Sequence, residues 1–183
     1  LHVVDRNNGK LVFKLPVTAH LARKAGHTLA CNEDVDRLLG AGELVGVWPE
    51  GFKGIGKRFS QRYQLQRFGR GGFVAAALRH GAPIVPVAIV GSEEIYPLIG
   101  DVPPVAKVLG LPYVPVTPTF PWLGPLGLLP LPVKYRIYFG APQRFDGEAS
   151  DEDAVIDLKV EQVKAKIAGM LARGRREREG VFS

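Results

Sequence analysis

The sequence predicts a single α/β domain with a central, mostly parallel sheet flanked by helices. Apolar stretches of strand length alternate along the chain with stretches of helical periodicity, the order expected for parallel strands joined by helices. Residues 84–90 are almost all apolar and mostly β-branched, which predicts a strand covered on both faces. A length of 183 residues, with 46% hydrophobic and 23% charged residues, suits one globular domain with a core.

The first part of the chain predicts short strands and two helices. Strands are expected at residues 1–4, 28–30 and 44–48. A helix is expected at 18–25, where Gly26 ends it, and another begins with Asn32 as its N-cap and ends at Gly42. The apolar run 44–48 stops at Pro49, which predicts a strand followed by a loop.

The second part predicts a loop as far as residue 68, then a helix that begins at Gly71 or Gly72 and ends near Gly81. Strands are expected at residues 84–90 and 135–139. The last helix, with a basic tail, covers 151–173 and is capped by Ser150 together with Asp153. Its apolar stripe has helical spacing and consists of Ile156, Val160, Val163, Ile167 and Met170 or Leu171.

Residues 109–133 form a proline-rich apolar segment as long as a membrane span. Its prolines would break the hydrogen bonds that a helix needs inside a bilayer, so it is not expected to cross one. Two interpretations stay open. The segment is either an irregular loop over the core or a surface that meets a membrane with Tyr113, Phe120 and Trp122 at the interface.

The net charge of +6 favours anionic partners such as phosphorylated metabolites, lipid headgroups or nucleic acid. Basic residues gather in one stretch that contains no acid after Glu50: Lys53, Lys57, Arg58, Arg62, Arg67 and Arg70. The adjacent acids Glu93 and Glu94, just past an expected strand, could face the site, but paired acids in such a turn are usually solvated, which is the expectation here. The single cysteine, Cys31, excludes an internal disulfide and a cysteine-based metal site, and no metal is expected.

The loop after residue 48 resembles a nucleotide-binding P-loop at Gly51, Gly56 and Lys57. A P-loop continues with a Ser or Thr whose hydroxyl binds Mg²⁺, whereas this chain has Arg58, whose guanidinium repels a metal ion. The later strand 84–90 also ends without the carboxylate that a P-loop enzyme needs. The sequence therefore argues against nucleotide hydrolysis.

Two short motifs carry a different resemblance. Trp48-Pro49-Glu50-Gly51-Phe52-Lys53 is similar to the Phe-Pro-Glu-Gly-Thr-Arg motif of the PlsC-like glycerolipid acyltransferases, the family of lysophosphatidate acyltransferases. The apolar strand Ile84-Val85-Pro86-Val87-Ala88-Ile89 is similar to that family's proline-containing fourth motif, at a fitting distance. The resemblance covers roughly residues 28–100 and implies a glycerolipid-acyltransferase-like fold.

The resemblance implies an O-acyltransferase of phospholipid biosynthesis, which moves a fatty acyl group from acyl-CoA or acyl carrier protein to a glycerolipid or lysophospholipid hydroxyl. It places Pro49, Glu50, Gly51 and Lys53 in the acceptor site, and it associates Pro86 with the acyl donor. Lys53 and Phe52 stand where the family has Arg and Thr, which leaves the acceptor headgroup open. No cofactor beyond the donor is implied.

A weaker anion pocket is expected from Lys57 and Arg58. The resemblance further implies a cytoplasmic protein at a membrane surface.

The family's catalytic His-x4-Asp pair is absent from this sequence. Five positions after its four histidines stand Asn7, Ala25, Asn32 and Val85. His20 and His80, on expected helices, are interpreted as surface or half-buried residues. No catalytic residue is therefore assigned within the chain, and the pair is expected upstream of Leu1.

Two alternative functions remain. The first is a nucleic-acid-binding module that uses the basic loop and Gly69-Arg70-Gly71-Gly72, although the nearby aromatics follow no RNA-binding pattern. Nucleic acid is accordingly not the expected partner. The second is a non-catalytic remnant that still binds lipid.

Overall fold

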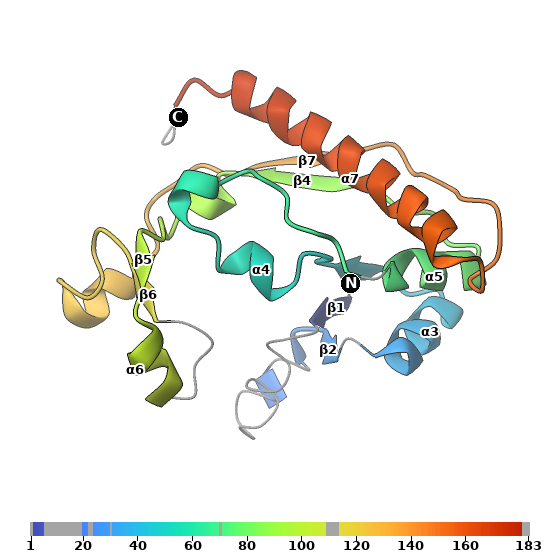
Figure 1. Cartoon of the computed structure of the whole chain (residues 1–183), viewed down its shortest axis with the longest axis horizontal. Helices are drawn as coiled ribbons and strands as arrows, with labels where there is room; N and C mark the ends of the chain where they lie inside the picture. Colours follow the sequence, from blue (N-terminus) through green and yellow to red (C-terminus); the bar gives the residue numbers. More distant parts are fainter. Residues whose placement is uncertain are drawn as a thin grey trace. The chain divides into compact units, whose positions relative to one another are not determined.

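The computed structural model describes residues 2–5, 20–21, 24–29, 31–69, 71–108 and 114–180 (Figure 1). The chain groups into two compact units, each of which is described by itself. The first unit consists of Leu1–Phe52, Gln66–Pro86 and Gly140–Lys166. The second unit consists of Lys53–Leu65, Val87–Phe139 and Ile167–Ser183.

The first unit contains a three-stranded parallel sheet in the order β2-β1-β3. Its strands are β1 (His2–Asp5), β2 (His27–Leu29) and β3 (Val45–Val47). The strands predicted in the first part of the chain are therefore confirmed, each with slightly shifted ends. Half of the helix expected at 18–25 lies outside the described residues, and of the other half His20, Leu21 and Lys24 are helical.

Two helices of the first unit begin and end close to the predicted positions. They are α3 (Asn32–Gly40) and α5 (Gly72–Arg79). The prediction that Asn32 is the N-cap was wrong, because the extended residue before the helix is Cys31 and Asn32 already has helical backbone. Two acids in the first turn, Glu33 and Asp34, favour this helix end through the helix dipole.

A charged contact ties α3 to α5 within the first unit. Asp36 Oδ1 accepts from Arg79 Nη2 at 2.8 Å, and His80 Nε2 lies 3.0 Å from the same oxygen. The hydrogen bond from Arg79 is the main reason that the pKa of Asp36 is lowered, with His80 adding to it. His80 therefore lies at the surface beside its partner Asp36, as expected of a histidine that takes no part in catalysis.

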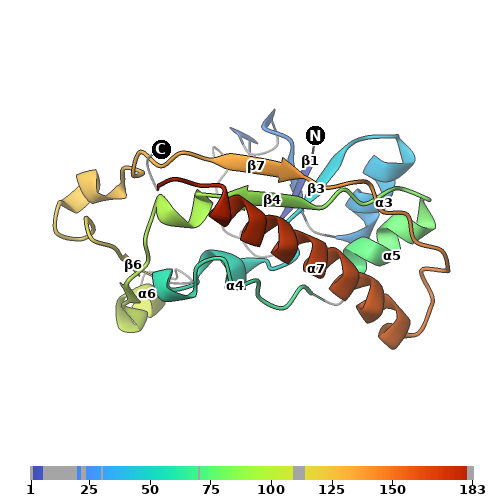
Figure 2. The same cartoon turned by 90° about the horizontal axis from the view of Figure 1, so that it is seen from above.

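The second unit contains a pair of antiparallel strands, β4 (Val87–Val90) and β7 (Arg136–Phe139), which lie side by side in Figures 1 and 2. The strand at 135–139 is thus confirmed. The prediction that 84–90 forms one strand with both faces covered was wrong. The regular strand begins only after Pro86, because proline has no N–H to donate to a neighbouring strand. Within that strand only alternate side chains are buried.

The buried face of β4 forms part of the second unit's core. Ala88 and Val90 pack against Leu171 of the long helix α7 (Asp153–Arg176), and Ile167 and Met170 pack beside them. The predicted apolar stripe is confirmed, since Ile156, Val160 and Val163 are buried in the first unit. The helix begins at Asp153, whereas the hydroxyl of Ser150 donates to Glu148 and so is not a cap.

The second unit also holds short elements. Two helical turns follow the first unit's sheet in sequence: α4 (Phe52–Ile55) and η1 (Phe59–Gln61). A further turn η2 (Ser92–Glu94) follows β4, and β5 (Gly100–Asp101) pairs antiparallel with β6 (Pro115–Val116). Between and after this pair stand α6 (Pro103–Val108) and η3 (Gly124–Leu128).

Strand pairing in the described residues is divided among three small sheets, of which only one is parallel. The expected central, mostly parallel sheet is therefore replaced by a mixed arrangement of helices and strands. Prolines at the end of β3 and before β4 keep both strands short. No helix in the part of the chain that the structure describes is long and apolar enough to span a bilayer.

Gly71 is required by a close approach at the start of α5. Its φ is +71°, and an added Cβ would lie 2.3 Å from Ile156 Cγ2 on α7. We expect Gly71→Ala to lower the free energy of unfolding by about 3 kcal/mol, because it adds both backbone strain and a steric clash. Urea denaturation measures this loss. The matched control is Gly42→Ala, at φ +74° with nothing within 4 Å, which should cost only about 1 kcal/mol. Equal losses would show that the contact with Ile156 is not restrictive.

The Asp36 contact makes a small, pH-dependent contribution to stability. Because the folded-state pKa of Asp36 is lowered, this contribution is present above the ordinary aspartate pKa and is lost as pH falls through the lowered value. Asp36→Asn should therefore cost about 0.5 kcal/mol at neutral pH, as expected of a partly exposed pair. The parent and variant should converge in acid. A difference between them that persists at the lowest pH would contradict this assignment.

Candidate functional site

The motif Trp48-Pro49-Glu50-Gly51 forms a tight turn at the end of β3. The Gly51 N–H donates to the Trp48 carbonyl at 3.0 Å, and Gly51 has a φ of +56°, which favours glycine. The turn therefore presents Glu50 at the carboxyl end of a parallel strand. Open α/β sheets bind their ligands at such ends.

Two hydrogen bonds join this turn to a later part of the chain. Glu50 Oε1 accepts the backbone N–H of Gln66 at 2.6 Å, and the Pro49 carbonyl accepts the N–H of Gly69 at 3.1 Å. Glu50 is half-buried. The carboxylate of Glu50 is consequently held in one position. The same hydrogen bond holds the end of the loop that begins after Gly51.

The other predicted site residues lie in different surroundings. Lys53 is exposed on α4 in the second unit. Pro86 is buried in the first unit, and its carbonyl accepts the N–H of Gly140 at 2.8 Å. The structure thus brings together Pro49, Glu50 and Gly51 in one turn, while the roles of Lys53 and Pro86 stay predictions.

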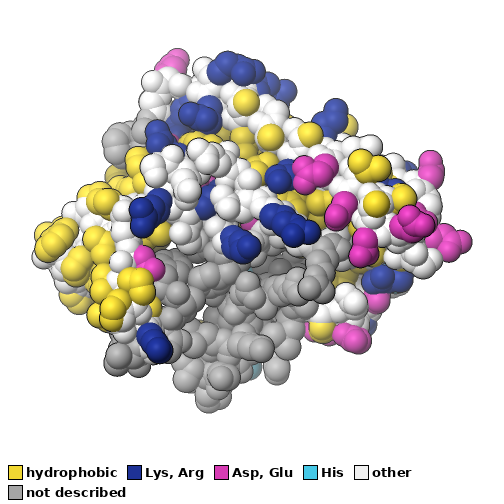
Figure 3. Space-filling view, viewed as in Figure 1, with side chains coloured by type: hydrophobic (Ala, Val, Ile, Leu, Met, Phe, Trp, Pro, Cys, Tyr) yellow, Lys and Arg dark blue, Asp and Glu magenta, His cyan; other side chains and the backbone are white. Residues whose placement is uncertain are grey.

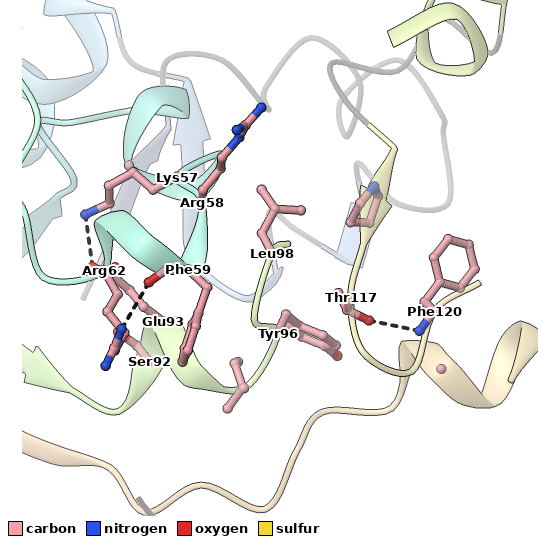
Figure 4. Close-up of a pocket in the computed structure, with 14 residues that line it drawn as sticks. Lys57, Arg58, Phe59, Arg62, Ser92, Glu93, Tyr96, Leu98, Thr117 and Phe120 are labelled. Carbon is pink, nitrogen blue, oxygen red and sulfur yellow. Dashed lines mark hydrogen bonds and ion pairs between the residues drawn. The ribbon is translucent and has the colours of Figure 1, made fainter. Parts of the chain in front are cut away.

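A cavity of about 500 Å³ lies within the second unit (Figure 4). This size is typical of small-molecule sites. Its wall combines cationic and apolar side chains with a few polar groups. They include Lys57, Arg58, Phe59, Arg62, Ser92, Glu93, Tyr96, Leu98, Thr117 and Phe120. Such a lining suits a ligand that has both an anionic group and an apolar part.

Lys57 reaches the cavity wall as a buried, paired cation. Its Nζ lies 3.0 Å from Glu93 Oε1 and donates to the Gln64 carbonyl at 2.9 Å. Glu93 Oε2 in turn accepts the backbone N–H of Tyr63 at 2.9 Å. Because Glu93 neutralises Lys57, this lysine contributes less to anion binding than the sequence suggested.

Arg58 is in a different state from Lys57. It is exposed, and in Figure 4 its guanidinium points away from the pair formed by Lys57 and Glu93. Its carbonyl accepts the N–H of Gln61 at 2.8 Å, but its guanidinium makes no hydrogen bond or ion pair with the described part of the chain. Arg62, by comparison, stacks over the Phe59 ring at 4.4 Å and lies 3.8 Å from Glu94 Oε1. Arg58 is therefore the better-placed cation for a ligand's anionic group.

Glu94, next to the cavity, is buried in an ion pair with Arg178, contrary to the expectation that both acids are solvated. Arg178 also donates to the hydroxyl of Tyr63, which accepts the N–H of Gly91 at 2.9 Å. Burial is the main reason that the pKa of Tyr63 is raised. The sequence contained one indication of this ion pair, namely two acids that follow a strand in a basic region. The pairing itself could not be predicted, because Glu94 and Arg178 are far apart along the chain.

The comparison with known proteins agrees with the two motifs. Residues 8–90 match the family model described as acyltransferase, a span that includes the Glu50 turn and the strand at β4. Residues 8–90 are therefore similar to the acyltransferase family. The resemblance to PlsC-like acyltransferases is thereby confirmed, whereas the donor and the acceptor are not identified by it.

Similar proteins occur in mycobacteria. An uncharacterized protein of Mycobacterium tuberculosis (strain H37Rv) is 54% identical over 175 residues, which are 94% of this chain and 49% of the relative. An uncharacterized protein of Mycobacterium leprae is also 54% identical over 175 residues, with 48% of its length covered. The chain thus spans about half the length of these relatives. No solved structure matches it significantly.

The pair of Lys57 and Glu93 should be important for the stability of the cavity wall. We expect Glu93→Gln to lower the free energy of unfolding by about 3 kcal/mol, because it leaves a buried lysine without its counter-charge. Adding Lys57→Met should restore most of this loss, since neither position of this pair then carries a buried charge. Chemical denaturation of the parent, both single variants and the double variant measures the coupling. Additive losses would contradict the pairing.

Proposed function

We propose that the protein transfers a fatty acyl group from a thioester, acyl-CoA or acyl carrier protein, to a hydroxyl of a glycerolipid or lysophospholipid. In this reaction the hydroxyl oxygen attacks the thioester carbonyl, an ester bond forms, and the carbon–sulfur bond breaks. The hydroxyl proton passes to a base, and the thiolate leaves and is protonated. The match to the acyltransferase family over residues 8–90 supports this class of reaction.

The observation that carries the proposal is the fixed position of Glu50. A carboxylate that accepts a backbone N–H at 2.6 Å has little freedom to rotate, so it can accept a hydrogen bond from an incoming hydroxyl with small entropic cost. Gly51, beside it, allows a ligand to approach the backbone closely. In this proposal Glu50 orients the acceptor, while the base that removes the proton is not assigned to this chain.

The cavity in the second unit supports an amphiphilic substrate. Arg58 would bind a phosphate group of a ligand in this cavity, since its guanidinium offers a planar fork of donors. Phe59, Tyr96 and Leu98 would contact the acyl chain. Lys53, an exposed point charge, would add long-range attraction for the same anionic group. Pro86 remains assigned to the donor side on the resemblance alone.

Binding of nucleic acid is less well supported. Among the cations of the basic stretch, Lys57 is paired with Glu93 and Arg62 lies near Glu94, so the charge available to a phosphate backbone is reduced. A lipid-binding remnant without catalysis differs from the proposal only in turnover. The two alternatives are therefore distinguished by the assay below.

We expect the complete gene product that carries this sequence to release CoA when it is given acyl-CoA and a lysophospholipid. Glu50→Ala should lower kcat/KM by about a hundredfold or more, because the hydroxyl loses its orienting partner. The measurement is continuous thiol release, with the acylated product identified by mass spectrometry. A panel of phosphorylated and neutral acceptors determines the headgroup.

Glu50→Gln is the control for folding, because its amide oxygen still accepts the Gln66 N–H. It should unfold at a similar denaturant concentration to the parent and yet lose activity. A fully active Glu50→Ala protein would remove the assignment of Glu50. Lipid binding without turnover would favour the remnant, and a salt-sensitive oligonucleotide shift without lipid binding would favour the nucleic-acid module.

A further inference from the structure

Four strongly exposed apolar side chains of the second unit lie in one short stretch around η3. Trp122 is 75% exposed and Leu126 is 68% exposed. We call this stretch the apolar knob, which consists of Trp122, Leu123, Leu126 and Leu129. In Figure 3 hydrophobic side chains collect on the side of the molecule where Figure 1 draws α6 and the segment after β6. Large apolar residues that cluster in this way mark an interaction surface.

Internal hydrogen bonds hold the knob in an ordered conformation. The Leu123 N–H donates to the Thr119 carbonyl at 2.9 Å, and Thr119 Oγ1 donates to the Gly127 carbonyl at 3.1 Å. An added Cβ at Gly127 would lie 2.4 Å from the Thr119 oxygen, so the backbone is closely packed there. The exposure of the knob is therefore built into this segment and does not result from a loose chain.

The same segment forms part of the cavity wall. Thr117, Phe120 and Gly127 line the cavity, and Figure 4 shows the hydrogen bond that Phe120 donates to Thr117. One interpretation of the sequence placed Phe120 and Trp122 at a membrane interface. The side chain of Phe120 is half-buried, whereas that of Trp122 is exposed. Tyr113 lies outside the described residues.

The charges around the knob favour one kind of partner. Residues 102–145 contain no Asp or Glu, and the exposed Lys107 and Lys134 stand on either side of the knob in sequence. Aromatic and leucine side chains flanked by lysines suit the boundary of a bilayer, where the apolar groups enter the acyl region and the lysines meet lipid phosphates. The two lysines, which have no acid between them in sequence, are also attracted to anionic headgroups.

We infer that the apolar knob inserts into the surface of an anionic phospholipid bilayer beside the cavity. This inference deepens the proposed function and rests on it for the identity of the acceptor as a lipid. It supplies the route by which such a lipid reaches the cavity wall. The binding itself requires neither donor nor acceptor, so it is measured independently of catalysis.

The first experiment is flotation of the 183-residue chain with vesicles of phosphatidylcholine, with and without phosphatidylglycerol. The chain should bind the anionic vesicles more strongly. Leu126→Glu should lower the partition coefficient by about tenfold or more, since it removes an inserted side chain and adds a repelled charge. The matched control is Leu158→Glu on α7, a leucine that is 66% exposed, which should change it by less than about twofold.

The second experiment uses the fluorescence of Trp122, which becomes the only tryptophan in a Trp48→Phe background. Emission should shift to the blue with anionic vesicles and be quenched by brominated lipid chains. Absent quenching, or equal effects of Leu126→Glu and Leu158→Glu, would overturn the inference. A chain that binds no vesicles but associates with itself would also overturn the inference if Leu126→Glu abolished that self-association. The apolar knob would then be a contact with a second copy of the chain. Vesicle binding by a protein without acyltransferase activity would leave this inference standing and reject only the proposed function.

Discussion

The hydrogen bond between Glu50 and the Gln66 N–H is the constraint on which the candidate site depends. Together with the bond between Pro49 and Gly69, it joins the two ends of a loop that contains residues 52–65. That loop carries the residues of α4 and η1, and through Lys57 and Arg58 it supplies the cationic part of the cavity wall. One carboxylate therefore closes the loop and also stands at the carboxyl end of β3.

The cavity wall is reinforced by charges that are removed from water. Lys57 pairs with Glu93, and Arg178 pairs with Glu94, in both cases within the second unit. Burying ions is costly, so such pairs contribute less to net stability than to the choice of one conformation. The conformation selected here is an unusual one, because Tyr63 has a φ of +65° while its N–H donates to Glu93. The pairs thus fix the backbone from which Lys57 and Arg62 extend.

Local elements were predictable from the sequence, and long-range pairing was not. The spacing of apolar residues located α3, α5 and the stripe of α7, since helical periodicity is a property of neighbouring residues. The family followed from Pro49-Glu50-Gly51 and the strand around Pro86. The pairing of β4 with β7 and of Glu94 with Arg178 joins residues distant in sequence, which no local pattern encodes. For the same reason Glu93 and Glu94 were expected to be solvated.

The segment that carries Thr119 and Gly127 has the apolar knob on its exposed side and lines the cavity with Phe120. The apolar knob and part of the cavity wall therefore belong to the same short segment. Under the proposed insertion, a lipid that stays within a leaflet would reach the cavity by lateral diffusion and would not pass through water. The rate of encounter would then follow the surface density of the lipid and not its bulk concentration.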